Sequence, residues 1–351
     1  MKGRAILIEP MSQGREIAAL VVDGVLQDLF FDLPESDLQP RLGAIYRAIP
    51  ARPAKGLHGA MVKLADGQVG FLRETVGLAA GKPLLVQVST LAEPGKAVPV
   101  TTRLLFKSRH VIVTPDAPGL NVSRRIRDEE DRARLLELGQ AGMAAAPENL
   151  GLILRSSCAW ASDAEIAQDL AQMRELAESI LREDGGRDPA LLLDGEGAAM
   201  RAWAAWCEAD PDEVIEGEHA LDRLGVWETI ETLRRADVDL VGGAWMSVEA
   251  TKALVAIDVN SGGDFSSSAT LRANIAAAHA IPRQLRLRGL GGKIVIDFAA
   301  LSKKDRPQIE KSLGSALKSD PVETSVAGWT PLGHLELNRK RERRPLAELL
   351  L

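Results

Sequence analysis

Two aspartates and one asparagine form the set of side chains best suited to chemistry in this sequence. Asp258 and Asn260 come at the end of the apolar run ALVAIDVN, and Asp297 comes near the end of KIVIDF. Residues two apart in a strand point to the same face, so Asp258 and Asn260 should lie together. Carboxylate and amide oxygens suit Mg²⁺, which keeps bound water and can complete its shell with phosphate. Such an ion activates water and stabilises the charge that develops during phosphodiester cleavage.

A strand, a helix and a second strand must bring these side chains together. ALVAIDVN is apolar at almost every position before Asp258, which is typical of a strand buried on both faces, and KIVIDF has the same form. A helix predicted from Ala269 to Leu287 joins them, so we expect parallel strands and a right-handed crossover. Both acidic ends then lie at one edge of the sheet, where ligands generally bind. Alternatively, Asp258 and Asn260 only shape the turn NSGGD.

Length and composition indicate a globular protein of several domains. A chain of 351 residues exceeds one ordinary core, so we expect about two to four compact units. The net charge of -6 argues against binding nucleic acid by bulk charge, so a nucleic-acid site must be local. Basic clusters exist that could also be solvated surface: Arg124, Arg125 and Arg127; Arg283, Arg286 and Arg288; and Arg339, Lys340, Arg341, Arg343 and Arg344.

The sequence shows neither a targeting segment nor a cysteine pattern typical of disulfides or zinc sites. The chain opens without a signal-peptide pattern and has no apolar run near the roughly 20 residues that a membrane span needs. We therefore expect a soluble cytoplasmic protein without membrane contact. Cys158 and Cys207 form no CxxC pair, and no histidine has ligand spacing to them. We expect reduced, buried thiols and no zinc.

The remaining elements are predicted from turns and periodicity. Residues 4–31 read as a meander of strands, and five short strands between residues 43 and 115 favour a closed barrel of the OB type. HVIVTP, at 110–115, is the last of these strands. Periodicity predicts helices at 127–140, 163–183, 196–209 and 226–236, and Asp163 is the expected N-cap of the second of these. Two more strands are predicted at 151–157 and 190–194.

Several of these segments carry a family resemblance. ALVAIDVNSGGD, followed by LRANIAAAHAIPRQLRLRGLGGKIVIDF, strongly resembles the catalytic region of the ribonuclease E/G endoribonucleases. GLNVSRRI at 119–126 and GLILRSS at 151–157 resemble the family's 5′-end sensor. GAIYRAIPARP and HGAMVKLADGQVGFL resemble its RNA-binding barrel, so the likeness extends over nearly all residues.

The resemblance implies a multidomain chain of α/β and α+β type. An OB-type β-barrel at 42–117 would be inserted in an abbreviated RNase H-like subdomain, formed by 1–41 plus 187–225. A 5′-sensor region at 118–186 would follow the barrel, and a deoxyribonuclease I-like catalytic α/β domain would occupy 226–351.

The resemblance also implies roles for the metal site. Asp258, Asn260 and Asp297 would be catalytic, with Asp258 and Asp297 as ligands of Mg²⁺, for which Mn²⁺ is the alternative ion. The substrate would be single-stranded RNA.

Further residues would bind that RNA. Arg155 and Ser156 take the positions of an arginine and a threonine that bind a 5′-monophosphate in the family; serine keeps the hydroxyl donor, and the arginine fork matches phosphate. Phe71 matches an aromatic that stacks on a base, while Met61 stands where another aromatic is usual. Without the resemblance, Arg155 would be a surface charge and Phe71 a barrel core residue. The RNA-binding set is Phe71, Arg124, Arg125, Arg155 and Ser156.

The chain also departs from the family pattern. The loop NSGGDFSSSAT is short and lacks family glutamates, and Pro282 should kink the helix that follows it. The region 210–245 lacks the segment GE.PLF, and TPLGHLELNRKR replaces RFGLLEMSRQR. The CPxC zinc-link is missing, so we expect a short form without zinc-link or C-terminal scaffold, as a monomer or dimer and not a zinc-linked tetramer.

These observations favour a Mg²⁺-dependent endoribonuclease that cleaves single-stranded RNA, with 5′-monophosphate sensing, in RNA processing or decay. The alternative, favoured by the shortened loops, is a non-catalytic or weakly active RNA-binding relative. A third interpretation is a generic α/β protein whose acidic strand ends only cap turns.

Overall fold

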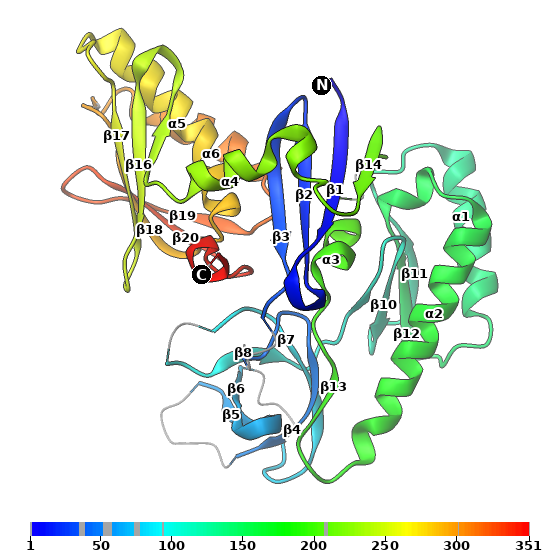
Figure 1. Ribbon diagram of the computed structural model, residues 1–351. Coiled ribbons are helices and arrows are strands. Elements are labelled where there is room, and N and C mark those ends of the chain that lie inside the picture. Colours follow the sequence, from blue (N-terminus) through cyan, green and yellow to red (C-terminus); the bar gives the residue numbers. More distant parts are fainter. Residues whose placement is uncertain are drawn as a thin grey trace. The chain divides into compact units, whose positions relative to one another are not determined.

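The computed structural model divides the chain into two compact units (Figure 1). The first comprises Met1–Gly24 and Phe30–Ala220, and the second comprises Val25–Leu29 and Leu221–Leu351. Among the described residues, no helix has both the length and the apolar character to cross a membrane. The structure describes residues 2–34, 39–51, 58–73, 78–92, 95–206, 210–300 and 302–350.

The N-terminal strands of the chain lie in a four-stranded sheet built from distant segments. Its order is β14-β1-β2-β3, and β14 (Glu213–Glu216) pairs in parallel with β1 (Arg4–Pro10). β2 (Glu16–Val22) and β3 (Val25–Phe31) follow β1 in sequence. Helix α3 (Ala198–Ala205) contributes Ala198 and Ala202 to the core of this sheet. Residues near 200 therefore pack with the N-terminal strands.

A closed five-stranded barrel follows. Its strands run in the order β4-β5-β6-β8-β7, and β7 pairs back with β4 to close the barrel. Alternating apolar residues fill its interior, and β13 (Ala190–Leu193) extends it at β4. The closed barrel is consistent with the expected OB type. The strands are β4 (Ile45–Pro50), β5 (Ala60–Lys63), β6 (Val69–Leu72), β7 (Leu84–Val88) and β8 (Val98–Thr101).

The prediction that HVIVTP belongs to the barrel was wrong. This segment forms β10 (Val111–Pro115), which pairs with β12 (Leu150–Leu154) in a separate sheet of order β11-β12-β10-β9. GAMVKLADGQVGFL folds into the hairpin of β5 and β6, so it supplies two barrel strands. A short apolar strand fits either sheet, and its sequence does not identify its partner. The other strands are β9 (Phe106–Lys107) and β11 (Gly119–Val122).

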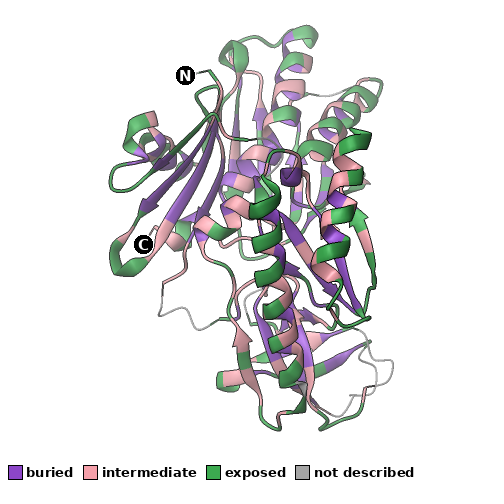
Figure 2. Cartoon of the chain, turned by 90° about the vertical axis from the view of Figure 1, so that its right-hand side faces the viewer, coloured by how far each residue is buried: buried purple, intermediate pink, exposed green. Residues whose placement is uncertain are grey.

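Two helices cover this third sheet. α1 (Glu129–Met143) and α2 (Asp163–Leu181) contribute Leu135, Ile166 and Leu170 to its core. The N-cap of α2 is Ser162, one residue before the predicted Asp163, and Ser162 forms a capping box with Glu165. Cys158 is buried here, as expected, and its Sγ donates to the carbonyl of His110 at 3.2 Å, while Cys207 lies outside the described residues. Figure 2 shows strands that are largely buried and long helices with exposed outer sides.

The second unit contains a six-stranded sheet of order β15-β16-β17-β18-β20-β19. The predicted crossover is present, because α5 (Ser267–Leu287) connects the parallel strands β17 (Val255–Asn260) and β18 (Gly292–Asp297). α5 remains helical through Pro282. The other strands are β15 (Asp237–Asp239), β16 (Trp245–Ala250), β19 (Thr324–Trp329) and β20 (Leu335–Arg339).

Among the described residues, helices cover one face of this sheet. Residues of α5 and α6 (Arg306–Ser319) share one core with the inward residues of the strands. Along β17, buried Val255, Ile257 and Val259 alternate with exposed Ala256 and Asp258. The prediction of strands buried on both faces was therefore wrong, and the polar residues lie on an open face.

The remaining helices are short. The helix predicted at 226–236 is α4 (Val226–Leu233), and α7 spans Leu346–Leu349. Residues 207–209 of the helix predicted at 196–209, and Arg52 and Pro53 of GAIYRAIPARP, lie outside the described residues. Single 3₁₀ turns occur at Ser12–Gly14, Ala65–Gly67, Ser156–Ala159, Arg182–Gly185, Asp222–Leu224 and Val241–Gly243.

Candidate functional site

Two carboxylates and one amide meet on the open face of the second unit's sheet. In the register of the parallel pair β17 and β18, Asp258 lies directly opposite Asp297. Asn260 is two residues after Asp258, and its Nδ2 donates a hydrogen bond to Asp258 Oδ2 at 2.7 Å. Asp258 and Asp297 are both exposed. The crossover thus brings the three residues together, although their catalytic role stays a prediction.

The position of this group differs in one respect from the expected one. Asp258 is the fourth of six residues in β17, so it lies on the face of the sheet and not beyond the strand's end. Asn260 and Asp297 are the last residues of their strands. The group therefore faces a surface along which an extended substrate could lie, instead of a crevice at the sheet's edge.

Three further side chains surround the group, and the sequence analysis singled out none of them. His334 Nε2 lies 3.6 Å from Asp297 Oδ2. On β16, Ser247 lies opposite Asp258, and Trp245, which is 37% exposed, lies opposite Asn260. Alternation in WMSVEA would have placed Trp245 and Ser247 on one face. His334 precedes β20 and left no comparable local signal.

The donor set has the chemistry of a Mg²⁺ site. Asp258 and Asp297 offer carboxylate oxygens, and the hydrogen bond from Nδ2 of Asn260 leaves its Oδ1 free to act as a ligand. However, among the described residues no cluster of three His, Cys, Asp or Glu side chains is arranged to hold a metal ion. Water and substrate phosphate would have to supply the remaining ligands, as is usual for Mg²⁺.

The predicted 5′-sensor residues meet at one edge of the first unit's third sheet. β11 and β12 are parallel, with Val122 opposite Leu154. Arg124 and Arg125 therefore follow the end of one strand while Arg155 and Ser156 follow the end of its neighbour. Arg124 and Arg125 are exposed.

Arg155 itself makes contacts that the sequence could not indicate. Its Nη1 donates to the carbonyl of Ser108 and its Nη2 donates to the carbonyl of Ala204. A phosphate would have to compete with these two acceptors for the terminal nitrogens. Arg155 thus joins β12 to α3 in this structure, and it is more than a surface charge. Its role in phosphate binding stays a prediction.

Phe71 lies on the outer side of the barrel. It is partly exposed, is absent from the barrel's core cluster and lies opposite Met61 on β5. A Cβ atom at Gly59 would come within 2.4 Å of Cζ of Phe71, so the glycine makes room for the ring. The alternative of a barrel core residue therefore does not hold, and the ring is placed where a base could reach it.

The sequence of this chain matches a known family and several of its members. A sequence model of the ribonuclease E/G family matches residues 106–221 and 213–342. The chain is 29% identical over 394 residues to ribonuclease E of Nostoc sp. (strain PCC 7120), covering 97% of this chain and 56% of that protein. It is 28% identical over 394 residues to ribonuclease E of Synechocystis sp. (strain PCC 6803), covering 97% of this chain and 57% of that protein.

A third relative is covered more fully. The chain is 27% identical over 390 residues to ribonuclease G of Escherichia coli (strain K12), covering 95% of this chain and 79% of that protein. The chain thus spans a little over half the length of the two ribonucleases E. Because the family match includes both the strand pair that carries Asp258 and Asp297 and the sheet that carries Arg155, the chain belongs to the ribonuclease E/G family.

Proposed function

We propose that this chain is an endoribonuclease that cleaves single-stranded RNA in the cytoplasm, in RNA processing or decay. The supporting observation is the direct register of Asp258 and Asp297 on an open face, with Asn260 bonded to Asp258. The relatives named above are ribonucleases, which favours the same activity.

The proposed chemistry assigns each residue a task. Asp258 and Asp297 would hold Mg²⁺, or Mn²⁺ in its place, and Asn260 would fix the orientation of Asp258 through its hydrogen bond. The bound ion would supply an activated water molecule and would neutralise charge on the phosphodiester. Asp258 and Asp297 are both exposed, so an extended RNA strand could reach the carboxylates. Cleavage would leave a 5′-phosphate on the downstream product.

The first unit would hold the substrate. Phe71 would stack on a base, which retains single strands without strong sequence preference. Arg124, Arg125, Arg155 and Ser156 would recognise a 5′-monophosphate. Arg124 and Ser156 are the better probes of this role than Arg155, because truncating Arg155 also removes its two bonds to main-chain carbonyls.

The activity can be tested with a 5′-monophosphorylated, AU-rich single-stranded RNA and Mg²⁺. Asp258→Asn and Asp297→Asn should each lower the cleavage rate on the order of 100-fold or more, because each removes a charged ligand. Asp237→Asn is the matched control, since Asp237 is exposed on β15 of the same sheet. Unchanged cleavage in either site variant would rule out the proposed metal site.

The second candidate function is a non-catalytic RNA-binding relative. The observation that favours it is that only two carboxylates lie at the candidate metal site, and no third joins them among the described residues. In the same assay this function predicts RNA binding by the parent protein that Asp258→Asn leaves intact, with no cleavage that depends on Mg²⁺. Replacing Arg124 by Gln or Ser156 by Ala should reduce the preference for 5′-monophosphate over 5′-hydroxyl RNA under either function.

A further inference from the structure

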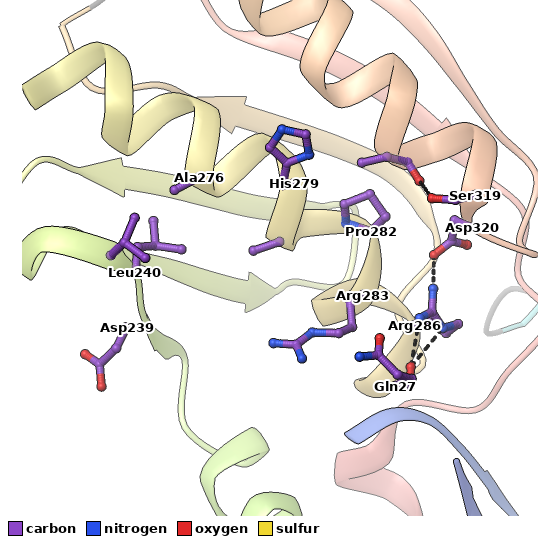
Figure 3. A pocket seen from close by; sticks show the side chains of 13 residues that line it. Gln27, Asp239, Leu240, Ala276, His279, Pro282, Arg283, Arg286, Ser319 and Asp320 are labelled. Carbon is purple, nitrogen blue, oxygen red and sulfur yellow. Dashed lines mark hydrogen bonds and ion pairs between the residues drawn. The ribbon is translucent and has the colours of Figure 1, made fainter. Parts of the chain in front are cut away.

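A pocket of about 750 Å³ opens on the helix-covered side of the second unit's sheet. Its walls come from α5, from the end of α6, from residues 239–241 and from Gln27, and they include neither Asp258 nor Asp297. Figure 3 shows these side chains around the space. Ligand sites for small molecules have volumes of about 300 to 1,000 Å³. The pocket therefore has room for one small ligand, away from the candidate active site.

Arg286 and Asp320, which line the pocket, belong to a cluster that holds more arginines than carboxylates. Arg286 contacts both Asp320 and Asp28. Asp320 also binds Arg339, with Nη2 to Oδ1 at 3.0 Å, and Asp28 also binds Arg343. These two carboxylates face three guanidinium groups, so the five side chains together carry one excess positive charge. Among the described residues of this network, both carboxylates are already paired, and no other carboxylate is left for an additional cation.

Arg283 is that additional cation. It lies one helical turn before Arg286 on α5. Its Nη1 makes a long hydrogen bond of 3.4 Å to the carbonyl of Leu26, and this distance is greater than the usual range for such bonds. Within the described part of the chain it forms no ion pair, and exposed Asp239 on the opposite wall does not contact it. Burial, with Arg286 nearby, lowers the pKa of Arg283. In Figure 3 dashed lines reach Arg286 but not Arg283.

We propose that this pocket binds a phosphate-bearing ligand of nucleotide size, with Arg283 as the residue that binds the phosphate. The planar fork of arginine matches phosphate oxygens, and an anion would offset the excess positive charge of the cluster. Leu240, Ala280 and Pro282 supply an apolar wall for a base or a sugar. The ligand is either a free nucleotide or the phosphorylated end of an oligonucleotide. The proposal does not depend on ribonuclease activity.

The test is a calorimetric titration of the metal-free full chain with adenosine monophosphate and with adenosine. The parent should bind one monophosphate per chain and bind adenosine at least about tenfold more weakly, because a charge-assisted bond is lost. Arg283→Gln should weaken monophosphate binding at least about tenfold. Arg272→Gln is the matched control, since Arg272 is an exposed arginine on the same helix, outside the pocket. It should retain the parent's affinity.

A second variant protects the test from a folding defect. Ala280→Glu keeps every arginine and adds a carboxylate to the pocket wall, so it should weaken binding to a similar extent while circular dichroism shows native helix content. A 5′-phosphorylated tetranucleotide that displaces the monophosphate would identify an oligonucleotide end as the ligand; failure to displace it would identify a free nucleotide. The proposal is overturned if the parent shows no saturable binding at millimolar monophosphate, or if folded Arg283→Gln binds as the parent does.

Discussion

Asp320 is one of the two carboxylates in the arginine cluster of the second unit, and the loss of its charge should be costly. Its side chain is 1% exposed, as is that of Arg339, and Arg286 is only 11% exposed. Asp320→Asn keeps the side chain's size but leaves two buried guanidinium groups facing a neutral amide. Arg339 would retain its bond to Thr324 Oγ1 at 2.8 Å as a polar contact. Removing one partner of a buried ion pair typically costs about 3–5 kcal/mol.

The assay must report on the second unit alone, because a chain of two units need not unfold in one step. Native-state hydrogen exchange of the amides in α5 and β18 meets this need. Glu231→Gln is the matched control: its pair with Arg234 is exposed, with side-chain exposures of 65% and 53%, so its loss should cost less than about 1 kcal/mol. A loss below about 1 kcal/mol for Asp320→Asn would refute the assignment of Asp320 as the buried charge partner.

Two further predictions concern the first unit. Burial lowers the pKa of His110 below its ordinary value of 6.5, although the charge of Asp169 acts in the opposite direction. The stability that depends on neutral His110 is therefore fully present above pH 6.5, and it is lost as the pH falls through the lower pKa of the folded state. His110→Gln should therefore lose less thermal stability than the parent between about pH 7.5 and about pH 5.5, and an equal loss in both proteins would contradict this. Phe71→Ala should weaken single-stranded RNA binding by about 5- to 150-fold, equivalent to about 1–3 kcal/mol. Leu191→Ala, which truncates another exposed apolar residue, is the control in a fluorescence titration, and equal affinities for both variants would count against stacking.

The convergence of Asp258 and Asp297 could be predicted because one continuous segment determines it. Residues 253–298 contain both strands and the helix between them, and a crossover of this kind places the strands side by side. The three apolar residues before each aspartate pair one to one, from Val255 with Ile294 onward, and this register sets the aspartates opposite each other. Local pattern was therefore sufficient.

The contacts that could not be predicted join segments far apart in the sequence. Arg155 donates to the carbonyl of Ala204, which is 49 residues away. Every residue has a carbonyl, so such an acceptor leaves no trace in residue type. His334 reaches Asp297 only because β20 pairs with β18. The partner of β10 was missed for the same reason.

The sequence also did not indicate whether helices cover one face of the second unit's sheet or both. This arrangement determines on which sides of the sheet the two proposed sites lie. Ala256 and Val295 occupy the open face although they are apolar, so the strands resemble strands buried on both sides. With α5 and α6 on one side, the carboxylates of the candidate active site and the arginine cluster lie on opposite sides of a hydrophobic core. The pocket is lined by neither Asp258 nor Asp297, so the two sites share no residue. Asp258→Asn should therefore leave nucleotide binding intact, and Arg283→Gln should leave the metal site intact, so that each proposal can fail without the other.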